Sequence, residues 1–170
     1  MELPFDDKLD ELDLQLQMFC KAPTHQAWRI IQELHHSPSV QLHPDYARNQ
    51  EKIKMFMTAV LANHPDWAET ADHQELLAQS AVRKAWLLGT SGDTNLRKID
   101  LIWYWYFATG DKELPLKVRA MADTIANGPS VREICVRTYC AISELHPELV
   151  ELAPELLKLG AHLSASRMRG

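Results

Sequence analysis

Cysteine is scarce in this chain, with 3 in 170 residues. Cys135 and Cys140 lie five positions apart, which puts them about 140° apart around a helix, so they do not pair with each other there. Both fall in an apolar stretch, and we expect them, with Cys20, to be reduced, packed thiols and not nucleophiles. A chain of this length can bury a sizeable core without a disulfide or a structural metal.

An excess of basic charge is also missing. The chain has 18 Lys and Arg against 23 Asp and Glu, a net charge of −5, and so offers no overall basic field to a phosphate backbone. Two basic pairs, Arg83-Lys84 and Arg97-Lys98, are isolated, and aromatic residues do not alternate with them. We expect both pairs to lie on solvated faces, and we expect no nucleic-acid partner.

No apolar run is long enough to cross a bilayer, and the first seven residues are acidic, unlike the basic and then apolar start of a leader. These two absences predict a cytoplasmic protein that does not insert into membranes. A periplasmic or exported protein whose signal peptide had been removed would have the same sequence features.

Strand patterns are missing as well, because apolar residues recur at spacings of three and four. We predict an all-α protein with seven to nine helices in stacked antiparallel hairpins, either a solenoid-type helical repeat or an irregular bundle. Residues 1–163 are expected to form a single domain, with 1–21 as an accessory N-terminal helix and 164–170 as a frayed tail. The composition, 46% hydrophobic and 24% charged, is ordinary for a soluble globular domain.

The longest apolar run, residues 99–111, holds two of the five tryptophans. On a helix its large side chains fall on two opposite faces. One face carries Ile99, Ile102, Trp103, Tyr106 and Phe107, and the other carries Leu101, Tyr104, Trp105 and Ala108. A helix that is apolar all round is a buried one, and Gly110 is expected to end it in the left-handed conformation.

Other helices follow from the same periodicity and from capping residues. We expect helices at about 7–21, 24–36, 45–63, 72–88, 115–126 and 130–145, then two short ones divided by Pro154, with a loop over 37–44. Thr24 is a predicted N-cap, and Asp72 with Glu75 and Ser130 with Glu133 have capping-box spacing.

A His-Pro-acid sequence recurs at three predicted helix junctions, beginning at His43, His64 and His146. Around two of them the similarity is longer, since residues 59–66 can be laid on residues 141–148. Two interpretations remain open: divergent repeats of a helical hairpin, or independent use of a favourable junction.

Three blocks resemble an uncharacterised group of small all-helical bacterial proteins. They are Gln50 to Trp67, Lys84-Ala-Trp-Leu-Leu-Gly-Thr-Ser-Gly-Asp and the aromatic run. The group's versions are a phenylalanine-rich helix ending in Asn-Pro or His-Pro, an Ala-Leu-Trp-Leu-Ser-Gly-Thr block and a Leu-Asp-Leu-Leu-Trp-x-x-Phe-Phe-Ala-Thr-Gly-Asp block. This chain has Leu88 for the group's serine, Ile99 for its leading leucine and Tyr106 for a phenylalanine. The resemblance implies an all-helical fold and brings no activity, cofactor or site residue.

Polar residues give few signs of chemistry. Glu69 and His73 are spaced i, i+4 like two metal ligands, but no third ligand is near in sequence, so we expect a solvated helix start and no metal. His35 and His36 end a predicted helix, where the dipole favours histidine; a ligand or a pH switch is the alternative. The 90–93 turn lacks the glycines and lysine of a phosphate loop.

We therefore predict a non-enzymatic protein-interaction module without a cofactor, such as a bacterial adaptor, chaperone or immunity-type inhibitor. One alternative is a helical enzyme that uses Asp100 or Asp111 with a histidine beside the aromatic helix, although Asp100 is more simply a carboxylate at a surface edge. Another is a carrier of a small apolar ligand.

The second face of the aromatic helix must be covered. Cover from within the chain would come from Val118, Met121 and Ile125. Otherwise Leu101, Tyr104 and Trp105 would bind another protein or a second copy of the chain in a homodimer.

Overall fold

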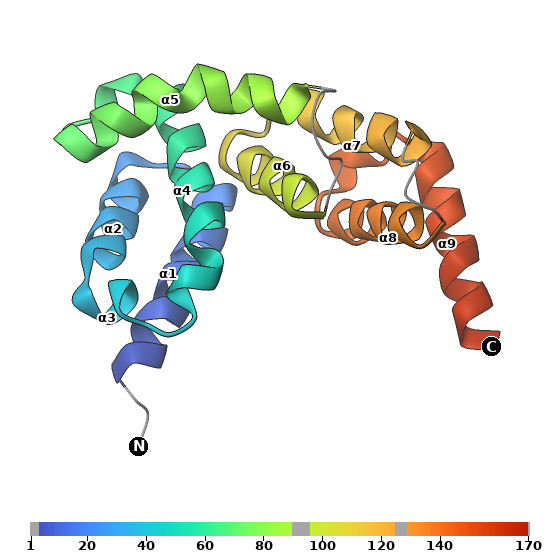
Figure 1. Cartoon of the computed structure of the whole chain (residues 1–170), viewed down its shortest axis with the longest axis horizontal. Coiled ribbons are helices and arrows are strands. Elements are labelled where there is room, and N and C mark those ends of the chain that lie inside the picture. The colour runs from blue at the N-terminus through green and yellow to red at the C-terminus, as the bar shows by residue number, and fades with distance from the viewer. Residues whose placement is uncertain (1–3, 90–95, 125–128, 170) are drawn as a thin grey trace. The chain divides into compact units, whose positions relative to one another are not determined.

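The computed structural model describes the backbone of residues 4–89, 96–124 and 129–169 and, within these, the side chains of residues 8–89, 97–121 and 132–162. Along these ranges it contains nine α-helices, two 3-10 helices and no strand (Figure 1). The prediction of an all-α fold with seven to nine helices is therefore confirmed.

The helices follow one another through short connections. In order they are α1 (Pro4–Lys21), α2 (His25–His36), α3 (Pro38–Gln41), α4 (Tyr46–Asn63), η1 (Pro65–Trp67), α5 (Ala71–Leu88), α6 (Leu96–Thr109), α7 (Glu113–Thr124), α8 (Pro129–Leu145), η2 (Pro147–Leu149) and α9 (Pro154–Arg169). Two differ from the prediction. A helical turn, α3, occupies part of the expected loop because Pro38 can begin one, and α9 continues past Ser164 to Arg169.

Local hydrogen bonds explain where several helices begin. The Thr24 hydroxyl accepts a bond from the Ala27 N–H at 3.1 Å, which confirms Thr24 as the cap of α2. For α5 the predicted cap, Asp72, is wrong. Thr70 accepts the bond from the His73 N–H at 3.1 Å, so Asp72 falls in the first turn, where its charge favours the helix dipole. The side chain of Ser130 lies outside the described residues.

The chain divides into two compact units, residues 1–81 with 107–109 and residues 82–106 with 110–170. In the first unit α1 and α2 form a helical hairpin, and α3 packs against both (Figure 1). Leu12, Leu16 and Phe19 of α1 are buried, and the Phe19 ring meets Phe56 of α4 edge-on at 5.9 Å. The apolar stripe of α1 therefore forms part of the core of the first unit.

In the second unit α8 packs against both α7 and α9 (Figure 1). Two aromatic residues lie at its centre. The buried Trp103 of α6 has its ring 5.8 Å from the ring of Tyr139 on α8. The Tyr139 hydroxyl donates a hydrogen bond to the Leu149 carbonyl at 2.8 Å, which attaches η2 to α8.

Helix α6 is buried on both faces, as its sequence predicts. The buried apolar side chains are Ile99, Leu101, Ile102, Trp103, Trp105, Tyr106 and Ala108. Gly110 has φ 70 and its N–H bonds to the Tyr106 carbonyl at 2.7 Å. The left-handed helix stop predicted at Gly110 is confirmed.

The three His-Pro-acid junctions share a backbone bond. In each, the third residue after the histidine donates its N–H to the histidine carbonyl: Tyr46 to His43 at 3.0 Å, Trp67 to His64 at 2.9 Å and Leu149 to His146 at 3.0 Å. Each donor residue is buried. The turn thus directs a large side chain into the core. At His64 and His146 it does so directly after α4 and α8 end, and at His43 it follows the short helix α3.

Truncation of Trp103 to alanine tests the core of the second unit. Trp103→Ala should lower the free energy of unfolding by about 3–5 kcal/mol, because a large buried side chain is removed and its space is not refilled. Urea denaturation followed by circular dichroism measures the change. Near-wild-type stability would contradict the burial of Trp103.

A close approach of two helices provides another test. A Cβ added at Gly160 of α9 would overlap the Cys140 sulfur of α8, so Gly160→Ala should destabilise the protein by about 1–3 kcal/mol through overpacking. Gly110→Ala is the matched control. No atom lies within 4 Å of its added Cβ, and we expect only the cost of a left-handed alanine, about 1 kcal/mol. Equal urea midpoints for wild type and Gly160→Ala would show that the helices are further apart.

Candidate functional site

Three histidine rings come together where α2 meets the first turn of α5. His35 and His36 have ring centroids 5.8 Å apart, and His36 and His73 have centroids 6.1 Å apart. His35 and His73 are buried, whereas His36 is exposed. We refer to His35, His36 and His73 as the histidine cluster.

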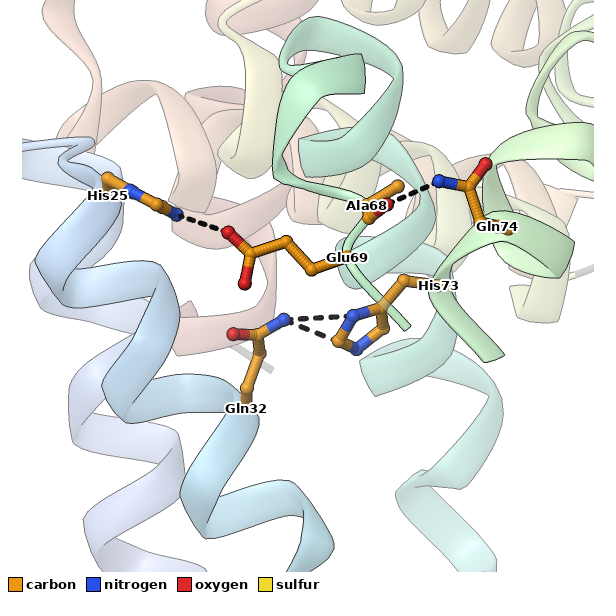
Figure 2. A network of polar contacts seen from close by, with 6 residues as sticks. All are labelled: His25, Gln32, Ala68, Glu69, His73 and Gln74. Carbon is orange, nitrogen blue, oxygen red and sulfur yellow. Dashed lines mark hydrogen bonds and ion pairs between the residues drawn. The ribbon is translucent and has the colours of Figure 1, made fainter. Parts of the chain in front are cut away.

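His73 is 2% exposed, so the predicted solvated helix start is wrong for this residue. Figure 2 shows its ring facing Gln32 of α2, whose amide nitrogen lies 2.9 Å from Nδ1 and 3.4 Å from Nε2. The other side of the ring packs on Trp28 at 5.6 Å. Burial, and then the charge of His36, lower the pKa of His73, and the charges of Asp72 and Glu69 oppose this shift.

His35 does not cap α2, which corrects the second prediction for this region. The Ser37 N–H bonds to the Leu34 carbonyl at the helix end, and the His35 ring turns inward with Nε2 2.7 Å from the Tyr46 hydroxyl. Its buried Nδ1 has no hydrogen-bond partner among the described residues. Burial, followed by the charges of His36, Lys54 and His73, lowers the pKa of His35 to about 4.

Trp67 lies between two further imidazoles. The His64 ring stacks on it at 3.7 Å and 7°, and the His25 ring at 5.0 Å and 18°. His25 also faces Glu69, with Nε2 3.8 Å from Oε1 (Figure 2). Beside this pair, the Gln74 amide donates to the Ala68 carbonyl, which fixes the turn that leads into α5.

The predicted i, i+4 ligand pair is therefore divided, because Glu69 faces His25 and His73 faces Gln32. Throughout the described residues, no group of three or more His, Cys, Asp or Glu side chains is positioned to hold a metal ion. The two buried members of the cluster lie against aromatic rings, His73 against Trp28 and His35 against Tyr46.

A smaller polar group lies beside α6 in the second unit. The Tyr106 hydroxyl donates to Glu148 Oε1 at 2.7 Å, and His146 Nδ1 lies 3.5 Å from the same oxygen. The hydrogen bond from Tyr106 is the largest cause of a lowered pKa at Glu148, and burial raises the pKa of Tyr106. The histidine near the aromatic helix is thus accompanied by Glu148, whereas Asp111 pairs with Lys84 at 2.8 Å. Asp100 is half-buried.

The cysteines match their prediction. All three are free thiols, and burial raises the pKa of Cys20 and Cys135 to about 11 and raises that of Cys140 as well. The Cys135 thiol donates a hydrogen bond to the Val118 carbonyl at 3.7 Å, and the Cys140 thiol donates one to the Leu156 carbonyl at 3.3 Å. Such thiols stay protonated and are poor nucleophiles.

The side chains predicted to meet a partner are mostly covered. Leu101 and Trp105 are buried and Tyr104 is half-buried. Val118 and Met121, expected to provide the cover, are buried too; the side chain of Ile125 lies outside the described residues.

An aromatic side chain that the sequence analysis did not single out is exposed instead. On α5, Trp86 is 44% exposed and Val82, one turn earlier, is 73% exposed. We refer to Val82 and Trp86 as the Trp86 surface. Below it Lys98 is only 2% exposed, so the predicted solvated position of Lys98 is wrong. Its ammonium lies 5.2 Å from the Trp86 ring centroid and bonds to the Gly89 carbonyl at 2.9 Å.

Helical periodicity could have predicted both unexpected features of α5, the burial of His73 and the exposure of Trp86. At about 100° per residue, His73 falls on the same side of α5 as Leu76, Leu77 and Leu87, which are apolar. Trp86 and Val82 fall on roughly the opposite side. The angular position of each residue around the helix therefore predicts a buried His73 and an exposed Trp86, whereas residue type alone does not.

The chain was compared with known protein families, curated proteins and solved structures. No protein-family model matches it, and neither does any curated protein or solved structure. Among the described helices, none has the length and apolar character needed to cross a bilayer.

The Tyr106–Glu148 bond can be tested by removing one hydroxyl. Tyr106→Phe should raise the pKa of Glu148, because its main stabilising donor is lost, and should cost about 1 kcal/mol or less, since the carboxylate stays hydrated. Carbon-detected NMR titration of Glu148 measures the first effect and urea denaturation the second. Tyr139→Phe, which removes a hydroxyl bonded elsewhere, is the control; an equal shift of the Glu148 pKa in both variants would refute the assignment.

Proposed function

We propose that this chain is a non-enzymatic helical module that binds another protein, with the Trp86 surface as its contact point. The observation that carries the proposal is the exposed indole of Trp86, the one large aromatic side chain more than a third exposed among the described residues. Tryptophan is the residue most typical of binding hot spots, since it buries a large area with few rotatable bonds.

The interior polar groups support a binding role over a catalytic one. His73 packs on Trp28 and His64 on Trp67, and burial raises the pKa of the Cys135 thiol. Catalysis would call for titratable groups gathered where a substrate can reach them. With Leu101 and Trp105 buried, we assign the contact to Trp86 in their place. The role would be that of an adaptor, chaperone or immunity-type inhibitor, acting without a cofactor.

We further propose that α4–η1–α5 and α8–η2–α9 are divergent copies of one unit, in which a helix ends at a His-Pro turn and a second helix follows. In support, His64 has φ −132 and ψ 69 and His146 has φ −128 and ψ 80. Each also donates its N–H at 2.9 Å to a carbonyl four residues earlier, Val60 or Ile142. Kinship with the bacterial group that the three sequence blocks resemble is part of this proposal. The first block covers most of α4 and all of η1, and the third covers most of α6.

Replacement of one exposed ring tests the binding role. Trp86→Ala should weaken binding of the partner by at least about 30-fold, as expected for a hot-spot residue, and should lower the free energy of unfolding by about 2 kcal/mol, because the buried Lys98 ammonium loses its contact with the ring. A photo-crosslinking residue at position 82 would identify the partner in the source cell, and calorimetry with the purified partner would measure affinity.

Leu145→Ala is the matched control, because Leu145 is 74% exposed on α8. It should leave the affinity unchanged. If Trp86→Ala bound as tightly as wild type, the Trp86 surface would not be the contact. If the crosslinked partner were a second copy of this chain, confirmed by light scattering, the module would be a homodimer and not an adaptor.

A further inference from the structure

The histidine cluster holds two buried imidazoles, His35 and His73, in positions that favour their neutral form. The Gln32 amide nitrogen, 2.9 Å from His73 Nδ1, donates to a lone pair that protonation would remove. At His35, the buried Nδ1 has no hydrogen-bond partner in the described part of the chain. A second proton on His35 would therefore leave a buried charged N–H unsatisfied.

Protonated rings would also repel one another. His36 lies between the other two, with centroids 5.8 and 6.1 Å from those of His35 and His73. From α4, the Lys54 ammonium adds repulsion at His35, and Tyr46 offers only a hydroxyl. From α3, Gln41 donates to the backbone carbonyl of His35 and supplies no charge.

Two carboxylates lie near enough to oppose this effect at His73. They are Asp72, in the first turn of α5, and Glu69, which faces His25. Their attraction is weaker than the sum of burial and the charge of His36, because the pKa of His73 is lowered on balance.

We propose that the histidine cluster is an acid-sensitive joint: as the pH falls below neutrality, protonation of its rings separates α2 from the first turns of α5. The joint lies within the first unit, where Gln32 and Trp28 of α2 contact His73 of α5. Separation would expose Trp28 and the inner face of α2 to solvent.

The direction follows from linkage. In the unfolded chain histidine titrates at about 6.5, whereas in the folded chain the pKa of His35 is about 4 and that of His73 is lowered. The folded state therefore binds fewer protons in this range. Its stability is complete above about pH 6.5 and is lost as the pH falls, with the folding constant dropping by up to about tenfold per pH unit for each shifted histidine.

Urea denaturation of the full chain at pH 8, 7, 6 and 5 tests the proposal in wild type, His73→Gln and His162→Gln. Wild type should be equally stable at pH 8 and 7 and then weaken progressively. His73→Gln should lose less over the same range, because it takes up one proton fewer on unfolding. His162, exposed on α9, is the control, and its variant should follow wild type.

His36→Gln keeps the test open if His73→Gln does not fold, since position 36 is exposed. Removing this charge should raise the pKa of both His35 and His73 in an NMR titration and reduce the acid loss of stability. Hydrogen exchange, compared as protection factors at pH 7.5 and 5.5, should show opening in α2 and the first turns of α5 and not in α8. Acid sensitivity unchanged in both His73→Gln and His36→Gln, or uniform loss of protection along the chain, would overturn the proposal.

Discussion

The first unit depends on the burial of one indole delivered by a 3-10 turn. Trp67 meets Phe19 of α1 edge-on at 6.3 Å, lies 6.5 Å from Trp28 of α2 and stacks on His64 at the end of α4. Three helices thus converge on one side chain. The His64-Pro65 junction places Trp67 at the end of a turn, which is closed by the hydrogen bond from the Trp67 N–H to the His64 carbonyl. Aromatic contacts of this kind contribute beyond their buried area.

The second unit uses the same turn with different chemistry. Leu149 occupies the position of Trp67, and its carbonyl accepts the Tyr139 hydroxyl. His146 and Glu148, which flank Pro147, meet Tyr106 of α6. A junction whose backbone is preserved while its side chains differ is what divergence of a repeat predicts. Reuse of a favourable turn would preserve the backbone equally well but gives no reason for the longer match of residues 59–66 with 141–148.

Most of the helical framework could be predicted from the sequence, because it follows from local rules. The spacing of apolar residues located the helices, Thr24 marked the start of α2, and Gly110 marked the end of α6. Each of these signals depends on residues within a turn or two. The prediction of Asp72 as the cap of α5 was wrong for a local reason as well, since the Thr70 hydroxyl, two residues earlier, accepts the capping hydrogen bond.

The candidate sites could be predicted only in part, because burial of a polar residue depends on what lies opposite it. His35 was assigned to a helix end by its position, yet its partner is Tyr46 on another helix. Lys98 was assigned to solvent because it is charged, yet its ammonium donates to the Gly89 carbonyl and lies against the Trp86 ring. No sequence rule supplies such partners, since both pairs form between helices that only the tertiary fold brings together.

The exposed Trp86 is in contact with a buried ammonium, that of Lys98. A buried ammonium needs acceptors on every side, and Lys98 finds one in the Gly89 carbonyl and another in the face of the indole. That contact occupies one face of the ring and restrains its rotation, while much of the rest stays in water. A ring already held in one orientation loses little entropy when a partner covers it, so the contact with Lys98 favours the role that we propose for Trp86.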